Sequence, residues 1–283
     1  NVTVPQNFLG LLKIIGDSTT PANVTITAAS ASSPIFTINR KQQAVWFDGL
    51  KLQGATSAEA INSDGANIYI GYVQFYNNLG HIEIANGYLE MMTGYTASTF
   101  DSNNISGSSS IYLRRFADFY SYQNLTLSNA DTGIFAVDSI GYVYGNLTVT
   151  LIPSTTTIGV NLASGASLQI YGNILIDGQT IDSGGSQYGV RATSNSSLYL
   201  TSPANTFEVK NVYTGIDLSI NSALGGAAGT VTYTSCTNNI ITDSTSSANG
   251  PIVGAATISA TETMVGADYR FFKLDQSTPQ TIL

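Results

Sequence analysis

The sequence has little of the chemistry on which many binding and catalytic sites depend. Among its 283 residues there is one cysteine, Cys236, and one histidine, His81. A single cysteine excludes an intrachain disulfide and any metal site built from several cysteines. A single histidine excludes multi-histidine zinc sites. We therefore expect neither a metal nor a cofactor.

Charged residues are also scarce. Only 10% of the residues are Asp, Glu, Lys or Arg, against about 25% in an average globular protein. The net charge is −8 with ten Lys and Arg. A phosphate backbone would be repelled, so we expect no nucleic-acid partner. No apolar run reaches the ~18 residues that a membrane span requires, so we expect no membrane insertion.

Ser, Thr, Asn and Gly take the place of the missing charges. Periodic Ile, Val and Leu run among them, which argues against disorder. The surface predicted from this composition is neutral and rich in hydroxyl and amide groups. Such a surface suits sugars and an extracellular location better than it suits nucleic acid.

Short apolar segments recur along the chain in three sets. One set is 122–127, 144–149 and 171–176, each entered through Asn; a second is 133–136, 159–162, 189–192 and 215–218, each beginning with Gly; a third is 68–70, 111–113, 168–170 and 198–200. A segment this short cannot bury its apolar side alone and must stack on its copies. Three sets predict three short strands per repeat.

The spacing of the repeats predicts the length of a coil. Apolar residues recur at 23-residue steps in two series: Ile15, Ile38, Ile61 and Ile84, and Val45, Ile68 and Met91. At ~3.3 Å per residue this length holds three strands of four to five residues, and residues one coil apart lie about 4.8 Å apart. The sequence predicts an all-β parallel β-helix over residues 1–247, with roughly 22–30 residues per coil.

The corners and the ends of the predicted coil carry their own signals. Asn124, Asn146 and Asn173 are expected to form an internal amide ladder at one corner. Loops of variable length near 153–158 and 178–188 mark the rim where function is expected. Residues 248–283 no longer match the repeat, and we interpret them as a cap or an oligomerisation segment.

Together, the stacked Ile, Val and Leu, the corner Asn residues and the variable loops resemble the single-stranded right-handed parallel β-helix of the pectin-lyase-like superfamily. The composition is similar to its phage tailspike branch. The resemblance implies a host surface polysaccharide as ligand, other virion proteins as partners, a homotrimer, and a place on the virion tail or otherwise outside the cell. The calcium-binding and arginine motifs of pectate lyases are not recognisable here, so no catalytic motif is carried over.

Residues in the middle of each strand triplet are expected to point outward in rows. Asn161, Arg191 and Asp217 follow Phe135 in one row, which fits either a sugar-binding groove or an exposed ion pair of small energy. A second row contains Trp46, Tyr69, Tyr112 and Tyr199, together with Glu90 and Gln169. Exposed aromatics of this kind suit stacking on sugars or an interface between subunits.

Glycoside hydrolysis usually needs two carboxyl groups roughly 5–10 Å apart. The candidates are Glu83 near His81, Asp118 near Arg114 and Arg115, the pair Asp177 and Asp182, and Asp217. We expect the side chains two residues apart at positions 81 and 83 to point the same way. Asp118 is expected to have a lowered pKa, and either neighbouring arginine to neutralise a uronate in a lyase.

Three functions remain open at this point. The leading hypothesis is a tailspike- or fibre-like virion protein that recognises a host surface polysaccharide. The first alternative is a polysaccharide depolymerase, either a hydrolase or a lyase, that uses carboxylates in a groove. The second alternative is a structural or adhesive bacterial surface β-helix without a catalytic site.

Overall fold

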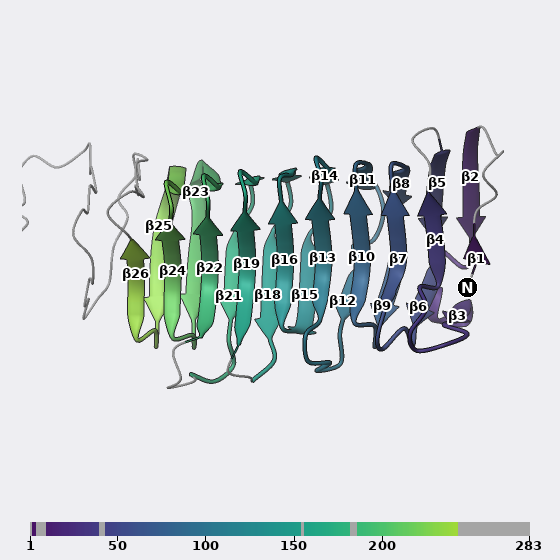
Figure 1. The fold of residues 1–283 in the computed structure, drawn as a ribbon, viewed down its shortest axis with the longest axis horizontal. Coiled ribbons are helices and arrows are strands. Elements are labelled where there is room, and N and C mark those ends of the chain that lie inside the picture. Colours follow the sequence, from purple (N-terminus) through teal and green to yellow (C-terminus); the bar gives the residue numbers. More distant parts are fainter. Residues whose placement is uncertain (1, 4–9, 40–42, 154–155, 182–185, 243–283) are drawn as a thin grey trace, which may run out of the picture.

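The computed structural model describes residues 2–3, 10–39, 43–153, 156–181 and 186–242. They form a right-handed parallel β-solenoid of about eight coils, built from strands and turns with almost no helix (Figure 1). The one helix in this part of the chain is a 3₁₀ turn, Pro21–Asn23. No helix within these ranges is long and apolar enough to cross a membrane. The predicted fold class is confirmed.

Each coil contributes one strand to each of three parallel stacks, here named A, B and C. Stack A contains β1 (Val2–Thr3), β4 (Phe36–Asn39), β7 (Glu59–Asp64), β10 (Gly80–Ala85), β13 (Ser109–Arg114), β16 (Thr132–Val137), β19 (Thr157–Ala163), β22 (Gln187–Thr193), β24 (Thr214–Ser219) and β26 (Asn238–Thr242). Stack B contains β2 (Gly10–Ile15), β5 (Gln43–Asp48), β8 (Asn67–Ile70), β11 (Tyr88–Met91), β14 (Asp118–Ser121), β17 (Ile140–Val143) and β20 (Ser167–Ile170). Stack C contains β3 (Thr25–Thr27), β6 (Leu50–Gln53), β9 (Val73–Tyr76), β12 (Thr99–Asp101), β15 (Leu125–Ala130), β18 (Leu147–Leu151) and β21 (Ile174–Asp177). Stacks B and C are joined at the far end by the long strands β23 (Ser197–Lys210) and β25 (Ala223–Thr234).

The core is a set of inward columns in which like residues lie on like. Ile134 pairs with Val160, and Val160 with Val190, and all three are buried. Leu125 pairs with Leu147, and Leu147 with Ile174, as the Asn-led repeat predicts. Burial of each such side chain stabilises the fold by roughly 1.5–3 kcal/mol.

The 23-residue register is only partly correct. Val45 does pair with Ile68, but Ile61 pairs with Ile82 rather than with residue 84. Ile38 pairs with Ser63, and Ile15 pairs with Asp48. Met91 pairs with Ile70, and the segment 111–113 belongs to stack A rather than with 68–70. For Ile61, Ile38 and Met91 the slip is two residues, which keeps the same side chains inward, so the apolar pattern alone cannot detect it.

The repeated glycines mark places where stack A approaches stack C closely. A Cβ added at Gly159 would lie 2.5 Å from the carbonyl oxygen of Gly189 and 2.5 Å from Cγ2 of Ile176. Gly133 and Gly189 occupy the same corner in neighbouring coils, with similar crowding. The glycine repeat therefore follows from the packing of aliphatic side chains against this corner.

The asparagine ladder exists, but it lies at the surface rather than inside. Oδ1 of Asn124 accepts the backbone N–H of Asn146 at 2.8 Å, and Oδ1 of Asn146 accepts that of Asn173 at 2.9 Å. Asn173 in turn accepts the backbone N–H of Thr206 at 2.9 Å. All three asparagines are exposed. They satisfy corner N–H groups that the sheets leave unpaired.

Candidate functional site

The outward residues of stack A form a single column. In chain order it contains Asn62, Glu83, Tyr112, Phe135, Asn161, Arg191 and Asp217. Asn161, Arg191 and Asp217 lie together as predicted. Tyr112 was expected in the row of Tyr69 and Tyr199, but it stacks on Phe135, with ring centroids 4.8 Å apart.

Glu83 lies at the centre of a small charged group on this face, here named the carboxylate cluster: Glu59, Asn62, Glu83, Tyr112 and Arg114. Nη2 and Nε of Arg114 each lie 2.5 Å from Oε1 of Glu83. Glu59, one coil earlier, is in hydrogen-bond contact with the Glu83 carboxyl group. Asn62 Nδ2 donates to Glu59 Oε2 at 3.3 Å. The structure thus adds a second carboxyl group, Glu59, that the sequence analysis missed.

The electrostatics of the cluster raise the pKa of Glu83 above its ordinary value. Burial raises the pKa of Glu83, and the charge and hydrogen bond of Glu59 raise it further. Arg114 opposes both effects without overcoming them. A carboxyl group with a raised pKa beside a second carboxyl group is the arrangement that acid–base catalysis uses.

His81 does not belong to this cluster, so the expected pairing of its side chain with Glu83 is wrong. It is fully buried between Phe75 and Phe100, with ring centroids 5.7 and 5.8 Å away. Asn78 Nδ2 and Ser102 Oγ lie 3.3 and 3.2 Å from its ring nitrogens. Burial lowers the pKa of His81 to about 3, so it stays neutral. All six residues of β10 are buried, so the alternation of buried and exposed residues on which this expectation rested fails in this strand.

The second charged group on stack A is the expected pair of Arg191 and Asp217. Arg191 Nε lies 3.2 Å from Asp217 Oδ2, in contact as an ion pair but without the alignment of a hydrogen bond. The guanidinium carbon also lies 5.2 Å from the centre of the Tyr188 ring. Asn161 occupies the preceding coil. The pair is partly exposed, and pairs of that kind contribute about 0–1 kcal/mol.

Stack B presents a different face, dominated by tyrosine. Its outward column contains Trp46, Tyr69, Glu90, Tyr120, Tyr142, Gln169 and Tyr199. A second column runs beside it at the end of each strand, through Tyr122, Tyr144 and Tyr171. We call Tyr88, Tyr120, Tyr122, Tyr142, Tyr144 and Tyr171 the tyrosine face. Sequence analysis missed Tyr120 and Tyr142 because the inward residues beside them, Ser121 and Gly141, are not large and apolar.

The rings of the tyrosine face stack along the solenoid axis. Ring centroids are 4.9 Å apart for Tyr120 and Tyr142, 4.9 Å for Tyr122 and Tyr144, and 4.7 Å for Tyr144 and Tyr171. This stacking covers ring faces between neighbours. Burial, and then the neighbouring phenols, raise the pKa of Tyr120 and Tyr144, so their hydroxyls stay neutral.

Trp46 lies at the N-terminal end of the same face. Its ring meets Tyr95 edge to face at a centroid distance of 6.0 Å. Lys13 Nζ lies 4.3 Å from the Trp46 ring centre, a cation–π contact. Tyr69 follows in the next coil and leans on Tyr88 at 5.9 Å. Trp46 and Tyr69 therefore extend the tyrosine face. Tyr199, beyond Gln169, lies over Gly225 and takes part in none of the ring contacts among the described residues.

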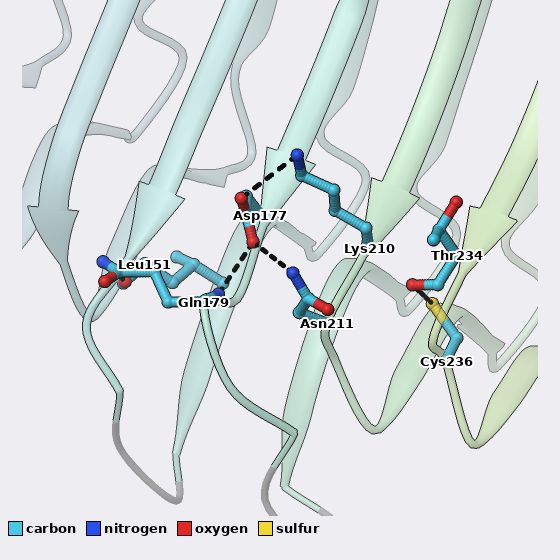
Figure 2. Close-up of polar contacts among 7 residues, drawn as sticks. All are labelled: Leu151, Asp177, Gln179, Lys210, Asn211, Thr234 and Cys236. Carbon is cyan, nitrogen blue, oxygen red and sulfur yellow. Dashed lines mark hydrogen bonds and ion pairs between the residues drawn. The ribbon is translucent and has the colours of Figure 1, made fainter.

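Asp177 lies at a corner of stack C, where its contacts are those of a structural residue (Figure 2). Its Oδ1 accepts Nδ2 of Asn211 at 2.9 Å and the backbone N–H of Gln179 at 2.8 Å, and Oδ2 lies 3.3 Å from Lys210 Nζ. Burial acts to raise the pKa of Asp177, but these partners outweigh it and lower the pKa.

The same arrangement occurs at Asp101, where Oδ1 accepts the N–H of Asn103 at 2.8 Å and Nδ2 of Asn129 at 2.9 Å. A contact set that recurs at an equivalent corner of the coil points to folding rather than catalysis. Cys236, also drawn in Figure 2, is half-buried, and burial raises the pKa of its thiol to about 11. It is therefore a poor nucleophile.

The remaining candidates are not brought into a site. Asp118 is exposed at the start of β14, and none of the ion pairs in the described ranges joins it to an arginine. The expected partner Arg114 binds Glu83 instead. Asp182 and residues 248–283 lie outside the described residues. Within the described residues, no three His, Cys, Asp or Glu side chains gather as metal ligands.

Comparison of the chain with protein-family models, with curated proteins and with solved structures found no match. The parallel β-solenoid itself follows from the strand register. A place in the pectin-lyase-like superfamily stays a proposal. The function must therefore be argued from the two outward faces.

Proposed function

We propose that this chain is the polysaccharide-recognising β-solenoid of a tailspike- or fibre-like virion protein, of the pectin-lyase-like type, displayed outside the cell. The tyrosine face is the surface that binds a host surface polysaccharide. One observation carries the proposal: phenol groups repeat once per coil in two adjacent columns. Within each column, successive ring centroids are 4.7–4.9 Å apart.

The stacked rings favour hydrogen bonding to sugar hydroxyls over stacking on sugar rings. Because neighbouring rings cover each other's faces, ring edges and neutral hydroxyls are the groups left for a ligand. Each hydroxyl both donates and accepts a hydrogen bond. Tyrosine has few rotatable bonds, and stacking holds it further, so binding costs little conformational entropy.

The test is affinity electrophoresis in gels that contain neutral or acidic polysaccharides. We expect a host-type polysaccharide to retard the protein, and the variant Y120F/Y142F/Y144F, which keeps the rings and removes three hydroxyls, to bind at least tenfold more weakly. The matched control is Y76F, a single exposed tyrosine on stack C that lies under Lys51. Unchanged retardation of the triple variant would contradict the proposal.

A second function is favoured by the carboxylate cluster. Glu83, with its raised pKa, is suited to be the general acid of a glycoside hydrolase, with Glu59 as the second carboxylate. In retaining enzymes the two carboxyl groups are about 5–5.5 Å apart. A lyase is less favoured because Arg114, which would have to neutralise the uronate carboxylate, already forms an ion pair with Glu83.

Hydrolysis is tested by following polysaccharide length by size exclusion and reducing ends by a colorimetric assay. If the chain is a depolymerase, E83Q and E59Q each stop the shortening, while D177N, at the structural corner, does not. If a polymer is retained but stays intact, the protein binds polysaccharide without hydrolysing it. If no polymer is retained or cut, the structural or adhesive solenoid becomes the better description.

A further inference from the structure

The tyrosine face carries a carboxylate in the middle of one of its aromatic columns. Glu90 takes the outward position in β11, where it pairs with Tyr69 on one side and with Tyr120 on the other. Oε2 of Glu90 accepts a hydrogen bond from the hydroxyl of Tyr88 at 2.7 Å. Among the described residues, Glu90 takes part in no other hydrogen bond and in none of the ion pairs. The phenol therefore holds the carboxylate on the face, and no cation of this part of the chain neutralises it.

A second carboxylate lies diagonally across from the first. Asp118 is exposed in the next coil, in register with Tyr88. One coil step of about 4.8 Å and two residues of about 3.3 Å each place the Cα atoms of Asp118 and Glu90 about 8 Å apart. The burial pattern of the two strands turns both carboxylates outward, on the same side as Tyr88 and Tyr120. One extended ligand on this face can therefore meet both carboxylates.

The two negative charges act on the phenols beside them. Burial raises the pKa of the Tyr88 hydroxyl, and the hydrogen bond to Glu90 and the charge of Glu90 raise it further. Burial, the Tyr142 phenol and then the charge of Asp118 raise the pKa of the Tyr120 hydroxyl. The potential around these hydroxyls is therefore negative, which attracts cations and repels anions.

Most cations of the described ranges are held away from these carboxylates. Those on stacks A and C each contact an acidic or aromatic side chain of their own face: Lys51, Arg114, Arg191 and Lys210. On stack B, Lys13 contacts Trp46, and three coil steps separate it from Glu90. Three steps are about 14 Å at ~4.8 Å per coil, which exceeds the Debye length of about 8 Å at physiological ionic strength. Lys13 therefore does little to neutralise the two carboxylates.

Arg115 is the exception, because it lies at the edge of the tyrosine face. It is exposed in the turn that leads into β14, and Asp138 is exposed in the corresponding turn of the next coil. Neither residue belongs to the ion pairs of the described ranges. Around β11, β14 and β17, the face and its edge thus hold three carboxylates, those of Glu90, Asp118 and Asp138, against one cation. The balance of charge on this part of the face stays negative.

We propose that Glu90 and Asp118 determine the class of ligand that the tyrosine face takes: a polysaccharide whose sugars carry free, protonated amino groups. This inference rests on the proposed function and adds a charge preference to it. A protonated amine donates up to three hydrogen bonds and complements a carboxylate in charge. The phenol hydroxyls beside the carboxylates bind the hydroxyls of the same sugars. A polysaccharide that carries uronate or sulfate groups is repelled by the two carboxylates.

The test is isothermal titration of the full chain with two sugars, a hexamer of glucosamine and the fully N-acetylated form of the same hexamer. In a mildly acidic buffer the two share a backbone and differ in the charge of the amino groups. Wild type is expected to bind the free-amine hexamer about tenfold more tightly or better, because two carboxylates each contribute up to about 1 kcal/mol, or fivefold. E90Q and D118N should each weaken that binding about fivefold and leave the binding of the acetylated hexamer unchanged. Glutamine at position 90 can still accept the Tyr88 hydroxyl, so the melting temperature should not fall.

Two further variants separate this site from the overall charge of the protein. The matched control E208Q removes one carboxylate from the outward side of stack C, and it should bind both hexamers like wild type. R115N removes the cation at the edge and places there a residue type that accepts its positive φ. It should bind the free-amine hexamer more tightly than wild type, a change that damage to the fold would not produce.

The outcomes distinguish this inference from the function on which it rests. Equal affinity of wild type for the two hexamers, or an E90Q variant that binds like E208Q, overturns the amine preference and leaves polysaccharide binding standing. The same holds if a polysaccharide retards the protein in the gel but neither hexamer binds. If no polysaccharide retards the protein and neither hexamer binds, both proposals fail.

Discussion

The outward faces of stacks A and B belong to the same coils but carry different chemistry. Stack A holds two charged groups, around Glu83 and around Arg191, separated by the stacked rings of Tyr112 and Phe135. Stack B holds neutral phenols in continuous contact. Because outward residues take no part in the core, each face of a solenoid can acquire its own function while the interior stays the same.

The largest effect is expected from substitutions that disturb the coil beneath the faces. G159A forces a Cβ against a backbone carbonyl of the next coil, which cannot move far, and should cost about 1–3 kcal/mol. In G141A, in β17 of stack B, the added Cβ would lie 2.7 Å from Cδ1 of Leu168. This substitution should cost less free energy, since the Leu168 side chain can rotate away. Urea unfolding of both variants measures the difference, and equal losses would contradict it.

The next largest effect should come from the charged groups of stack A. E83A leaves Arg114 without a hydrogen-bond partner in a partly buried place and should lower the free energy of unfolding by about 1–3 kcal/mol. D217N, in the more exposed pair, should change it by about 0–1 kcal/mol. Denaturant titration at neutral pH compares them. A larger loss in D217N would mean that burial does not determine which of the two ion pairs contributes more to stability.

Aromatic pairs distinguish stability from binding on the two faces. Y120A/Y142A and Y112A/F135A each remove a stacked pair, and each should lose about 0.5–1.5 kcal/mol beyond the lost burial. Only the first should also lose polysaccharide retardation in the gel. If the second variant alone loses it, the sugar binds on stack A instead.

The smallest effect is a pH dependence that belongs to stack A. Glu83 has a raised pKa in the folded state, so the folded chain binds more protons there than the unfolded chain. Its contribution to stability is therefore present in acid and is lost as the pH rises through the folded pKa. E83Q should flatten this part of the stability–pH curve, while Y120F should leave it unchanged. An unaltered curve in E83Q would place the titration elsewhere.

Strands could be predicted from the sequence where large apolar residues fill the inward positions. The strands after Asn124, Asn146 and Asn173 were placed correctly because Leu, Val and Ile fill their inward positions. Tyr120 and Tyr142 were missed because small residues stand inward beside them. The interior space that a larger residue at position 141 would fill is taken by Phe119 and Leu168 of the neighbouring coils.

The candidate sites were harder to predict than the strands because they depend on register. Glu59 meets Glu83 since β7 and β10 pair at a step of 21 residues, two fewer than the regular spacing. His81 was misplaced because every residue of β10 is buried, so the alternation assumed for positions 81 and 83 fails there. Contacts between side chains of different coils depend on several register shifts. Each shift leaves the apolar alternation intact, so the sequence does not reveal it.

The asparagine ladder gives the growth of the solenoid a direction. In every rung the acceptor comes earlier in the chain than the N–H that it binds, from Asn124 to Asn146 to Asn173. During synthesis, the coils that contain Asn146, Asn173 and Thr206 therefore each meet a carboxamide already displayed on the coil before. A chain made from its amino end can add coils one at a time on a finished template.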